Sequence, residues 1–474
     1  MNPPLVALLT FGDNRAHEWE KVFKTLTEER HGQALEYFGR MPVELHAPAD
    51  VVRHQQEIDA RVDELKIAGA ETLIAHVPCW TSPNLVVRAV QRAALPTVVL
   101  SNRSPATHGT VGFLGTCGAL DQIGYPHLRL REDFQAPNPD TIADSVLPYL
   151  RAVSARSRLR GKVFGLFGGR SLGIDTGTFD PMQWKSIFGV DTEHIDQLEI
   201  IRRAETVSEE KTLKMLKWLE KSVARVDYGK GNLTMEKLTF QVRCYIAVKD
   251  IIAEQGLDFV AIKCMPDLST YYVPQCISAA LLPSPFDAEG ERDPVMMACE
   301  ADADAALTME ILKLVAGGKA SMFADVSYID HEEQVLYLPN CGALCSWYAR
   351  RSATAEENLR EIELRPANRP GGGAITYFTA SPGPLTLARL FRKNGCYRMA
   401  IGSGRAVELS PEKHAAFINA RGNHQLPAVF VKTELNLDSL IQSFGSNHIL
   451  AIDGNYLKEL EYFCQMLDIT PERY

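Results

Sequence analysis

Short apolar runs alternate with longer amphipathic segments through the first third of this 474-residue chain. The apolar runs at residues 5–12, 72–79 and 96–101 have the length of buried strands, and the segments between them carry apolar residues at helical spacing. This alternation is typical of a parallel sheet flanked by helices. We therefore expect an α/β domain over residues 1–160.

The same alternation restarts with the run KVFGLFGG and continues through LDFVAIKC, which predicts a second α/β domain over residues 161–316. Beyond about residue 345 the pattern changes to alternating segments such as AITYFTA and PAVFVKTE. The RPGGG run and Asn394-Gly395 divide these segments with turn residues. A β-rich domain over residues 317–474 is expected, with a last helix from about Tyr456.

Composition and charge narrow the class of protein. Hydrophobic residues make up 46% of the chain, and its net charge of -9 comes from scattered acids rather than blocks. No basic patch points to nucleic acid or an anionic membrane, so a small-molecule partner is expected. No signal peptide and no run of about 18 apolar residues is visible, which predicts a soluble, cytoplasmic protein.

The ten cysteines lie mostly inside apolar runs, so we expect them to be reduced and buried. Cys341 and Cys345 are the closest pair in the sequence. They lack a second pair of cysteines or a matching histidine spacing, which disfavours a zinc site there.

The most informative stretch, residues 293–328, reads as strand, helix, Gly-Gly stop and strand. Glu300 follows the run VMMAC where the first strand ends, a position at which open α/β sheets place their ligand crevice. Asp325 follows SMFA on the next strand, and both carboxylates can face one pocket if the two strands are neighbours. Asp302 and Asp304 fall in the first turn of the helix, where we expect them to complement the helix dipole.

Two carboxylates that converge in an apolar setting repel each other unless a proton or a cation lies between them. Oxygen ligands with one imidazole suit Mn²⁺, Mg²⁺ or Co²⁺. The imidazole candidate is His448 in FGSNHILAIDG, one of twelve histidines. Spacing alone leaves a structural alternative, in which Glu300 caps the following helix, Asp325 pairs with a surface cation and His448 is an ordinary hydrogen-bonded side chain.

Around these residues the sequence resembles the L-fucose isomerase family, whose members interconvert L-fucose with L-fuculose and often D-arabinose with D-ribulose. The resemblance spans most of residues 160–474 and is carried by GKVFGLFGGRSLGID, DFVAIKC, EADADAALTM, FADV, RPGGG, RKNGCY and NHILAIDG. It implies two Rossmann-like, doubly wound α/β domains followed by a β-rich C-terminal domain. It also implies a homohexamer with sites at the subunit contacts.

The resemblance assigns the metal ligands and the chemistry. The glutamate of the EAD motif, the aspartate of FADV and the late histidine match Glu300, Asp325 and His448, with Mn²⁺ as the expected ion and Mg²⁺ or Co²⁺ as alternatives. The implied activity is aldose-ketose isomerisation, in which a cis-enediolate forms and Glu300 and Asp325 carry protons between C1 and C2. A hydride shift is the competing mechanism.

Four further residues are candidate substrate contacts. The family places the tyrosine that matches Tyr397 at the sugar, and Trp80 matches an aromatic wall carried by the first domain. Arg15 resembles a basic contact that reaches the neighbouring subunit's site, and Asn447 adjoins His448. The alternatives are core packing for Trp80 and Tyr397, a surface charge for Arg15 and a turn cap for Asn447.

One loop departs from the family pattern. Where the family typically has K-G-Q-R-E, this chain reads Lys263-Cys264-Met265-Pro266-Asp267, so it lacks a glutamine and an arginine that help line the sugar site. The departure leaves another sugar open, for instance a 6-deoxy-6-sulfo hexose such as sulfoquinovose.

Two other classes of protein share part of this sequence pattern. Gly165, Gly168, Gly169 and Gly173 follow a strand, but their spacing is not G-x-G-x-x-G, which disfavours a nicotinamide dehydrogenase. A non-catalytic sugar-binding protein is the second alternative, because two α/β domains around a cleft also describe solute receptors. Such a receptor needs no trio of metal ligands.

Overall fold

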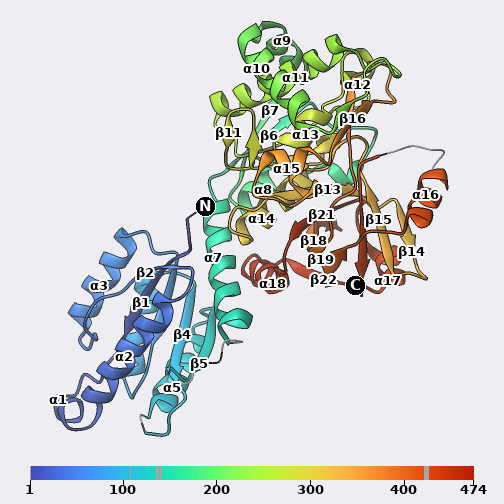
Figure 1. The fold of residues 1–474 in the computed structure, drawn as a ribbon. Coiled ribbons are helices and arrows are strands. Elements are labelled where there is room, and N and C mark those ends of the chain that lie inside the picture. The colour runs from blue at the N-terminus through green and yellow to red at the C-terminus, as the bar shows by residue number, and fades with distance from the viewer. Residues whose placement is uncertain (1, 107, 135–137, 139–140, 421–425) are drawn as a thin grey trace. The chain divides into compact units, whose positions relative to one another are not determined.

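The computed structural model describes residues 2–106, 108–134, 138, 141–420 and 426–474 (Figure 1). The chain divides into two compact units, Met1–Ser157 and Arg158–Tyr474. Within the described ranges, no helix is both long enough and apolar enough to span a membrane.

The first unit is built on a five-stranded parallel sheet. The strands run in the order β2 (Glu44–His46), β1 (Leu5–Thr10), β3 (Thr72–His76), β4 (Thr97–Asn102) and β5 (His127–Glu132). In this doubly wound order the direction of winding reverses between β1 and β3, the position at which sheets of this kind commonly bind ligands.

Helices cover both faces of this sheet (Figure 1). They are α1 (Ala16–Glu18), the π-helical turn η1 (Trp19–Phe23), α2 (Lys24–Gly39), α3 (Gln55–Ile67), α4 (Pro83–Ala93), α5 (Gly109–Gln122), the π-helical turn η2 (Ile142–Val146) and α7 (Leu147–Leu159). Helix α4 illustrates why they form. Pro83 starts it at a position where the missing N–H costs nothing, and its buried residues recur at helical spacing against the sheet.

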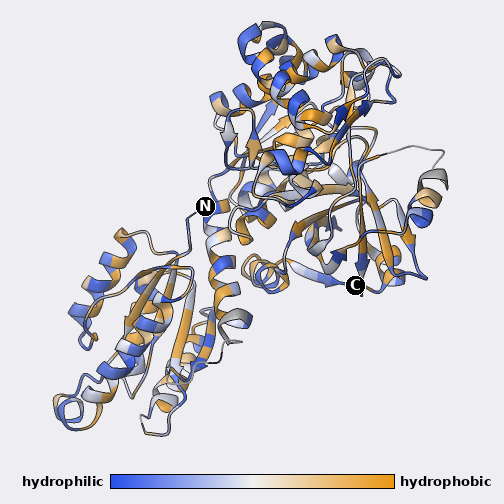
Figure 2. Cartoon of the chain, viewed as in Figure 1, coloured by the Kyte–Doolittle hydropathy of each residue, from blue (hydrophilic) through white to orange (hydrophobic). Residues whose placement is uncertain are grey.

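The second unit contains a four-stranded parallel sheet. Its order is β12 (Met297–Ala298), β9 (Phe259–Ile262), β6 (Val163–Phe167) and β7 (Asp191–Ile195). The accompanying helical segments are η3 (Asp175–Gly177), α8 (Pro181–Ile187), α9 (Leu198–Thr206), α10 (Glu209–Ser222), α11 (Met235–Gln255), α12 (Asp267–Tyr271), α13 (Cys276–Leu281), η4 (Cys299–Ala301) and α14 (Ala303–Val315). In Figure 2 apolar residues concentrate on the strands, while the helices show hydrophilic stretches.

An antiparallel sheet follows in the same unit. Its path runs through β13 (Ser321–Asp325), β21 (His448–Asp453), β18 (Gly383–Lys393), β19 (Cys396–Ala406), β20 (Ala428–Thr433), β15 (Val335–Pro339) and β14 (Tyr328–Asp330), and β22 (Thr470–Arg473) adds to β19 in parallel. The expected turn at Asn394-Gly395 joins β18 to β19, and both turn residues have positive φ as a tight hairpin requires. The helices here are η5 (Ser346–Ala349), α15 (Ala355–Leu359), α16 (Pro411–Ala420), α17 (Leu437–Ser443) and α18 (Leu457–Met466).

Helix α14 connects the two sheets of the second unit. It packs on β9 and β12 of the parallel sheet and on β13, β18 and β21 of the antiparallel sheet. All of its residues are buried because it has a sheet on each side. The predicted fold class is thus confirmed, with parallel sheets flanked by helices and a strand-rich C-terminal part, whereas the predicted boundary between residues 316 and 317 stays a prediction.

The second unit also contains a small sheet of β8 (Arg225–Val226), β16 (Glu363–Pro366) and β17 (Ala374–Tyr377), and a separate short hairpin of β10 (Phe286–Asp287) and β11 (Gly290–Glu291). The loop from β16 to β17 holds the run RPGGG. Gly371 donates its N–H to the carbonyl of Ser269 at 3.0 Å, and Gly373 donates to that of Asn232 at 3.0 Å. A Cβ at Gly371 would collide with the carbonyl oxygen of Tyr272, so the glycine allows the loop to pack closely.

We expect Gly371→Ala to lower the free energy of unfolding by about 1–3 kcal/mol, because the added methyl group must displace backbone atoms. Gly169→Ala is the matched control, since an added Cβ there has no neighbour within 4 Å and the backbone φ is ordinary. Its effect should stay within about 0.5 kcal/mol. Urea denaturation measures both, and equal effects would contradict the close packing of this loop.

Candidate active site

The structure brings Glu300, Asp325 and His448 together. Nε2 of His448 lies 3.2 Å from Oε2 of Glu300 and 3.2 Å from Oδ1 of Asp325. The imidazole is fully buried, whereas 10% of the Glu300 side chain and 31% of the Asp325 side chain are exposed. Two carboxylates thus meet one ring nitrogen at the edge of the core.

Two different sheets supply these three side chains. Asp325 and His448 are paired directly across β13 and β21 of the antiparallel sheet. Glu300 comes from the parallel sheet, two residues after β12 ends at Ala298. The prediction from the sequence required the strands that precede Glu300 and Asp325 to be neighbours in one sheet. They are not neighbours, because α14 carries the chain from one sheet to the other. The carboxylates converge nonetheless.

The backbone at Glu300 adopts a left-handed conformation, with φ 56° and ψ 24°. Ala301 follows with φ 54°. A residue other than glycine takes this conformation at a cost of about 1–2 kcal/mol. Such residues concentrate at functional sites, so the turn supports a functional role for Glu300 rather than a simple helix cap.

Asp302 links the start of α14 to His448. Its Oδ1 accepts the N–H of Ala305 at 2.9 Å, which makes it the N-cap of the helix. Its Oδ2 lies 2.6 Å from Nδ1 of His448 and 2.9 Å from Nη1 of Arg389. The helix-start role predicted for Asp302 is correct but incomplete, because the same carboxylate also orients the candidate metal ligand.

Charge explains how these buried groups coexist. Burial would raise the pKa of Asp302, but Arg389 and the hydrogen bond from His448 hold it below its usual value. The ionised carboxylate accepts the Nδ1 proton of His448, which turns Nε2 toward Glu300 and Asp325. Burial disfavours charge on the ring, yet the hydrogen bonds with the three carboxylates raise the pKa of His448 well above its ordinary value.

The segment after β6 supports this arrangement from the other side. The carbonyl of Thr176 accepts from Nη2 of Arg389 at 2.8 Å, and its hydroxyl donates to Oδ1 of Asn447 at 3.0 Å. A Cβ at Gly177 would lie 3.1 Å from Cα of Asp302, so this glycine permits a close approach. The segment after β6 thus helps to hold Arg389 and Asn447 in place. Asn447 is exposed, and its Nδ2 lies 2.9 Å from Nε2 of His448.

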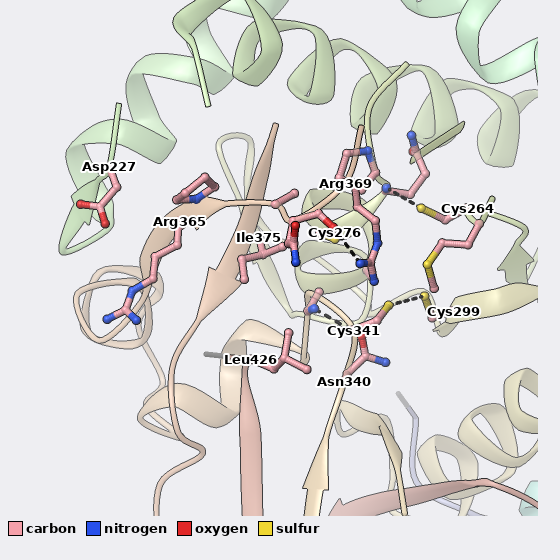
Figure 3. A pocket seen from close by; sticks show the side chains of 18 of the residues that line it. Asp227, Cys264, Cys276, Cys299, Asn340, Cys341, Arg365, Arg369, Ile375 and Leu426 are labelled. Atoms are coloured by element: carbon pink, nitrogen blue, oxygen red, sulfur yellow. Dashed lines mark hydrogen bonds between the residues drawn. The ribbon is translucent and has the colours of Figure 1, made fainter. Parts of the chain in front are cut away.

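A cavity of about 730 Å³ opens beside Asp325 (Figure 3). Cys264 and Met265, from the loop that departs from the family pattern, line it. Cys299 and Cys341 line it as well, with their sulfur atoms 3.7 Å apart. The altered loop therefore helps to shape the cavity that reaches a candidate metal ligand.

Tyr397 does not line this cavity. Its side chain is buried, its hydroxyl donates to Oδ1 of Asp304 at 2.8 Å, and the hydroxyl accepts from Nε1 of Trp184 at 2.7 Å. Burial raises the pKa of Asp304 to about 6 despite the nearby arginines. Tyr397 thus lies where the core-packing alternative puts it.

Arg15 and Trp80 belong to the first unit, in the loops that follow β1 and β3. These two loops are joined at the reversal point of the sheet, where the hydroxyl of Thr81 donates to the carbonyl of Gly12 at 3.0 Å. Arg15 forms ion pairs with Asp13 at 2.6 Å and with Glu18 at 3.6 Å, and half of its side chain is exposed. Trp80 is half-buried beside the cluster that contains Trp19 and Cys79.

The side chains of the site match a divalent metal in donor type. All ten cysteines are free thiols, and in the described part of the chain no group of three or more His, Cys, Asp or Glu side chains could hold an ion as it stands. The donors of Glu300, Asp325 and His448 nevertheless suit Mn²⁺ or Mg²⁺ in type. Their separations from Nε2 resemble the roughly 3 Å between adjacent ligands around an octahedral ion with bonds of about 2.1 Å.

Replacement of Arg389 by Met should lower the free energy of unfolding by about 3–5 kcal/mol, because the buried carboxylate of Asp302 would lose its cation. Arg170→Met is the control. Arg170 pairs with Asp175 at the surface, where 54% and 77% of the two side chains are exposed, so its loss should cost about 0–1 kcal/mol. Chemical denaturation compares the two, and similar losses would mean that Asp302 does not depend on Arg389.

Known proteins resemble this chain in both of its units. The first N-terminal domain of L-fucose isomerase matches residues 6–161, and the C-terminal domain of L-fucose isomerase matches residues 338–472. A sulfoquinovose isomerase of Alkalicoccus urumqiensis is 22% identical over 82% of this chain and 84% of its own. The L-fucose isomerase of Bacteroides thetaiotaomicron is 25% identical over 70% of this chain and 68% of its own, and that of Vibrio vulnificus is 23% identical over 87% and 82%.

Among solved structures, a periplasmic solute-binding protein of Actinobacillus succinogenes with bound D-allose covers 67% of this chain and 92% of its own, at 12% identity and a TM-score of 0.17. That likeness is too weak to support the sugar-binding alternative. The two matching family domains together cover more than half of the sequence, and the relatives span both units. The chain therefore belongs to the L-fucose isomerase family of aldose-ketose isomerases.

Proposed function

We propose that this aldose-ketose isomerase depends on a divalent metal ion held by Glu300, Asp325 and His448. The observation that carries the proposal is the approach of two carboxylate oxygens to Nε2 of His448, at 3.2 Å each. Without a proton on Nε2, a lone pair would face two anionic oxygens, and a cation among them relieves that repulsion. Mn²⁺ is the ion we favour, with Mg²⁺ and Co²⁺ as alternatives.

When bound, the ion would supply Lewis acidity that polarises the sugar carbonyl. Glu300 and Asp325 carry the protons: one removes the proton from C2, and a proton returns to C1 through a cis-enediolate. Asp325 lines the cavity and is the more exposed of the two carboxylates. His448 is not assigned as a base, because its ring is fully buried and its Nδ1 is committed to Asp302.

Asp302 and Arg389 act as positioning residues in this proposal. Asp302 fixes the orientation of His448 by accepting the Nδ1 proton, so that Nε2 faces both carboxylates and can exchange its proton for the ion. Arg389 keeps Asp302 ionised in the core. Asn447, exposed next to Nε2, is assigned to a hydroxyl group of the sugar.

The substrate is an aldose, and the lining of the cavity bears on which aldose is bound. The relatives carry the names L-fucose isomerase and sulfoquinovose isomerase. The cavity walls formed by Cys264 and Met265 favour a sugar other than L-fucose, because this loop lacks the polar side chains that the family typically has there. Arg15 and Trp80 are proposed to contact the sugar in the site of a neighbouring subunit, within a homohexamer.

The test is ketose formation from a panel of aldoses that includes L-fucose, D-arabinose and 6-deoxy-6-sulfoglucose. Chelation should abolish turnover and added Mn²⁺ should restore it. Glu300→Gln should lower kcat by about 10²–10⁴-fold, because it removes both a ligand and a proton carrier. Glu332→Gln, at an exposed carboxylate, is the matched control and should keep full activity. Full activity of Glu300→Gln, or turnover that survives chelation, would contradict the proposal.

A further inference from the structure

The cavity beside Asp325 is unusually rich in cations. Those that line it are Arg225, Lys230, Arg365 and Arg369. Three of these cations form ion pairs, and they share two carboxylates, Asp227 in the turn that follows β8 and Glu363 on β16. The ion pairs are Arg225 with Asp227 at 3.2 Å and with Glu363 at 2.9 Å, Lys230 with Asp227 at 3.5 Å, and Arg365 with Glu363 at 2.5 Å.

Arg369 differs from the other three. No carboxylate of the described residues lies within ion-pair distance of its guanidinium, and its Nη1 donates only to the adjacent carbonyl of Asn368, at 2.9 Å. Cys264 and Cys276 lie within reach of its charge. Burial raises the pKa of the Cys264 thiol to about 12 and that of Cys276 well above its usual value, so both thiols are neutral and leave the charge of Arg369 uncompensated.

The loop that carries Arg369 is held firmly. Gly371, two residues on, is bonded to the carbonyl of Ser269, and its Cα packs against the backbone of Tyr272 too closely for a side chain. Figure 3 shows the Arg369 side chain running into the middle of the cavity near Cys276 and Cys341, whereas Arg365 extends toward the side of Asp227. A loop held in place before the ligand arrives loses little freedom on binding.

We propose that Arg369 binds an anionic substituent on the sugar, at the end of the substrate away from the reacting carbonyl. The guanidinium offers a planar fork of donors that matches a sulfonate, phosphate or carboxylate group with two parallel hydrogen bonds. Asp325 lines the same cavity, so an anionic group bound by Arg369 leaves the carbonyl end of the sugar to face Asp325. The substrate class is then an acidic aldose, an inference that rests on the proposed isomerase function.

The test compares acidic aldoses with a neutral one on the purified full chain with Mn²⁺. The probes are 6-deoxy-6-sulfoglucose, glucose 6-phosphate and glucuronate, against 6-deoxyglucose, and they separate the three anionic groups. The wild type should favour at least one acidic aldose by about tenfold to a hundredfold in kcat/KM, the range expected of a hydrogen bond to a charged group. Arg369→Gln should remove this preference by raising KM for the acidic aldose far more than it raises KM for 6-deoxyglucose.

Lys230→Gln is the matched control, because it removes one positive charge from the same cavity but from a residue that is already paired. The Lys230→Gln variant should keep the preference for the acidic aldose. A wild type that favours the neutral sugar, or an Arg369→Gln variant that keeps the preference or weakens acidic and neutral sugars alike, would overturn the inference while leaving the isomerase function intact. Failure of the wild type on every aldose would instead overturn the proposed function, and the inference with it.

If the Arg369→Gln variant does not fold, the salt dependence of KM in the wild-type protein tests the inference instead. Raising the salt concentration from about 0.01 M to about 1 M should increase KM for the acidic aldose several-fold, because salt screens the charge of Arg369, and should leave KM for 6-deoxyglucose unchanged. A KM for the acidic aldose that does not respond to salt would count against the inference.

Discussion

The candidate site depends on one buried ion pair, between Arg389 and Asp302. Both side chains are fully buried, and their charged atoms lie 2.9 Å apart. A carboxylate in the core is costly unless a cation and hydrogen bonds compensate it. With that compensation, Asp302 can cap α14 with one oxygen and hold His448 with the other. The orientation of the imidazole therefore rests on a buried charge that Arg389 helps to stabilise.

The position of helix α14 explains why residues from distant parts of the second unit meet at this site. Because it packs between the parallel and antiparallel sheets, its first turn lies where side chains from both sheets can meet. Glu300 arrives through a left-handed turn from the parallel sheet, and Asp325 and His448 arrive as a pair across two antiparallel strands. A site assembled in this way is rigid at its buried end and open at Asp325, where the cavity begins.

Much of the fold could be predicted from the sequence, because it depends on residues that are close together in the chain. Apolar runs and helical spacing indicated the parallel sheets, and Asn394-Gly395 marked the hairpin between β18 and β19 because only such residues adopt two positive φ angles easily. The motifs around Glu300, Asp325 and His448 singled out the three residues that meet.

What could not be predicted depends on distant parts of the chain. The partner of Asp302, Arg389, is far from it in the sequence and becomes its neighbour only after β18 packs on α14. The same limit applies to Tyr397, since a motif match does not reveal whether its side chain faces the cavity or Asp304. In the sequence, Arg369 is recognised only as part of the RPGGG turn. Its lack of a carboxylate partner depends on which charged residues surround it in the folded chain.

The central claim is that Glu300, Asp325 and His448 hold one divalent ion. Anomalous X-ray diffraction from crystals soaked in Mn²⁺ tests it most directly. The account predicts one anomalous peak per chain, about 2.1 Å from Nε2 of His448 and from oxygens of both carboxylates. No peak at these three side chains in a well-occupied soak, or a peak held instead by the thiols of Cys299 and Cys341, would contradict it.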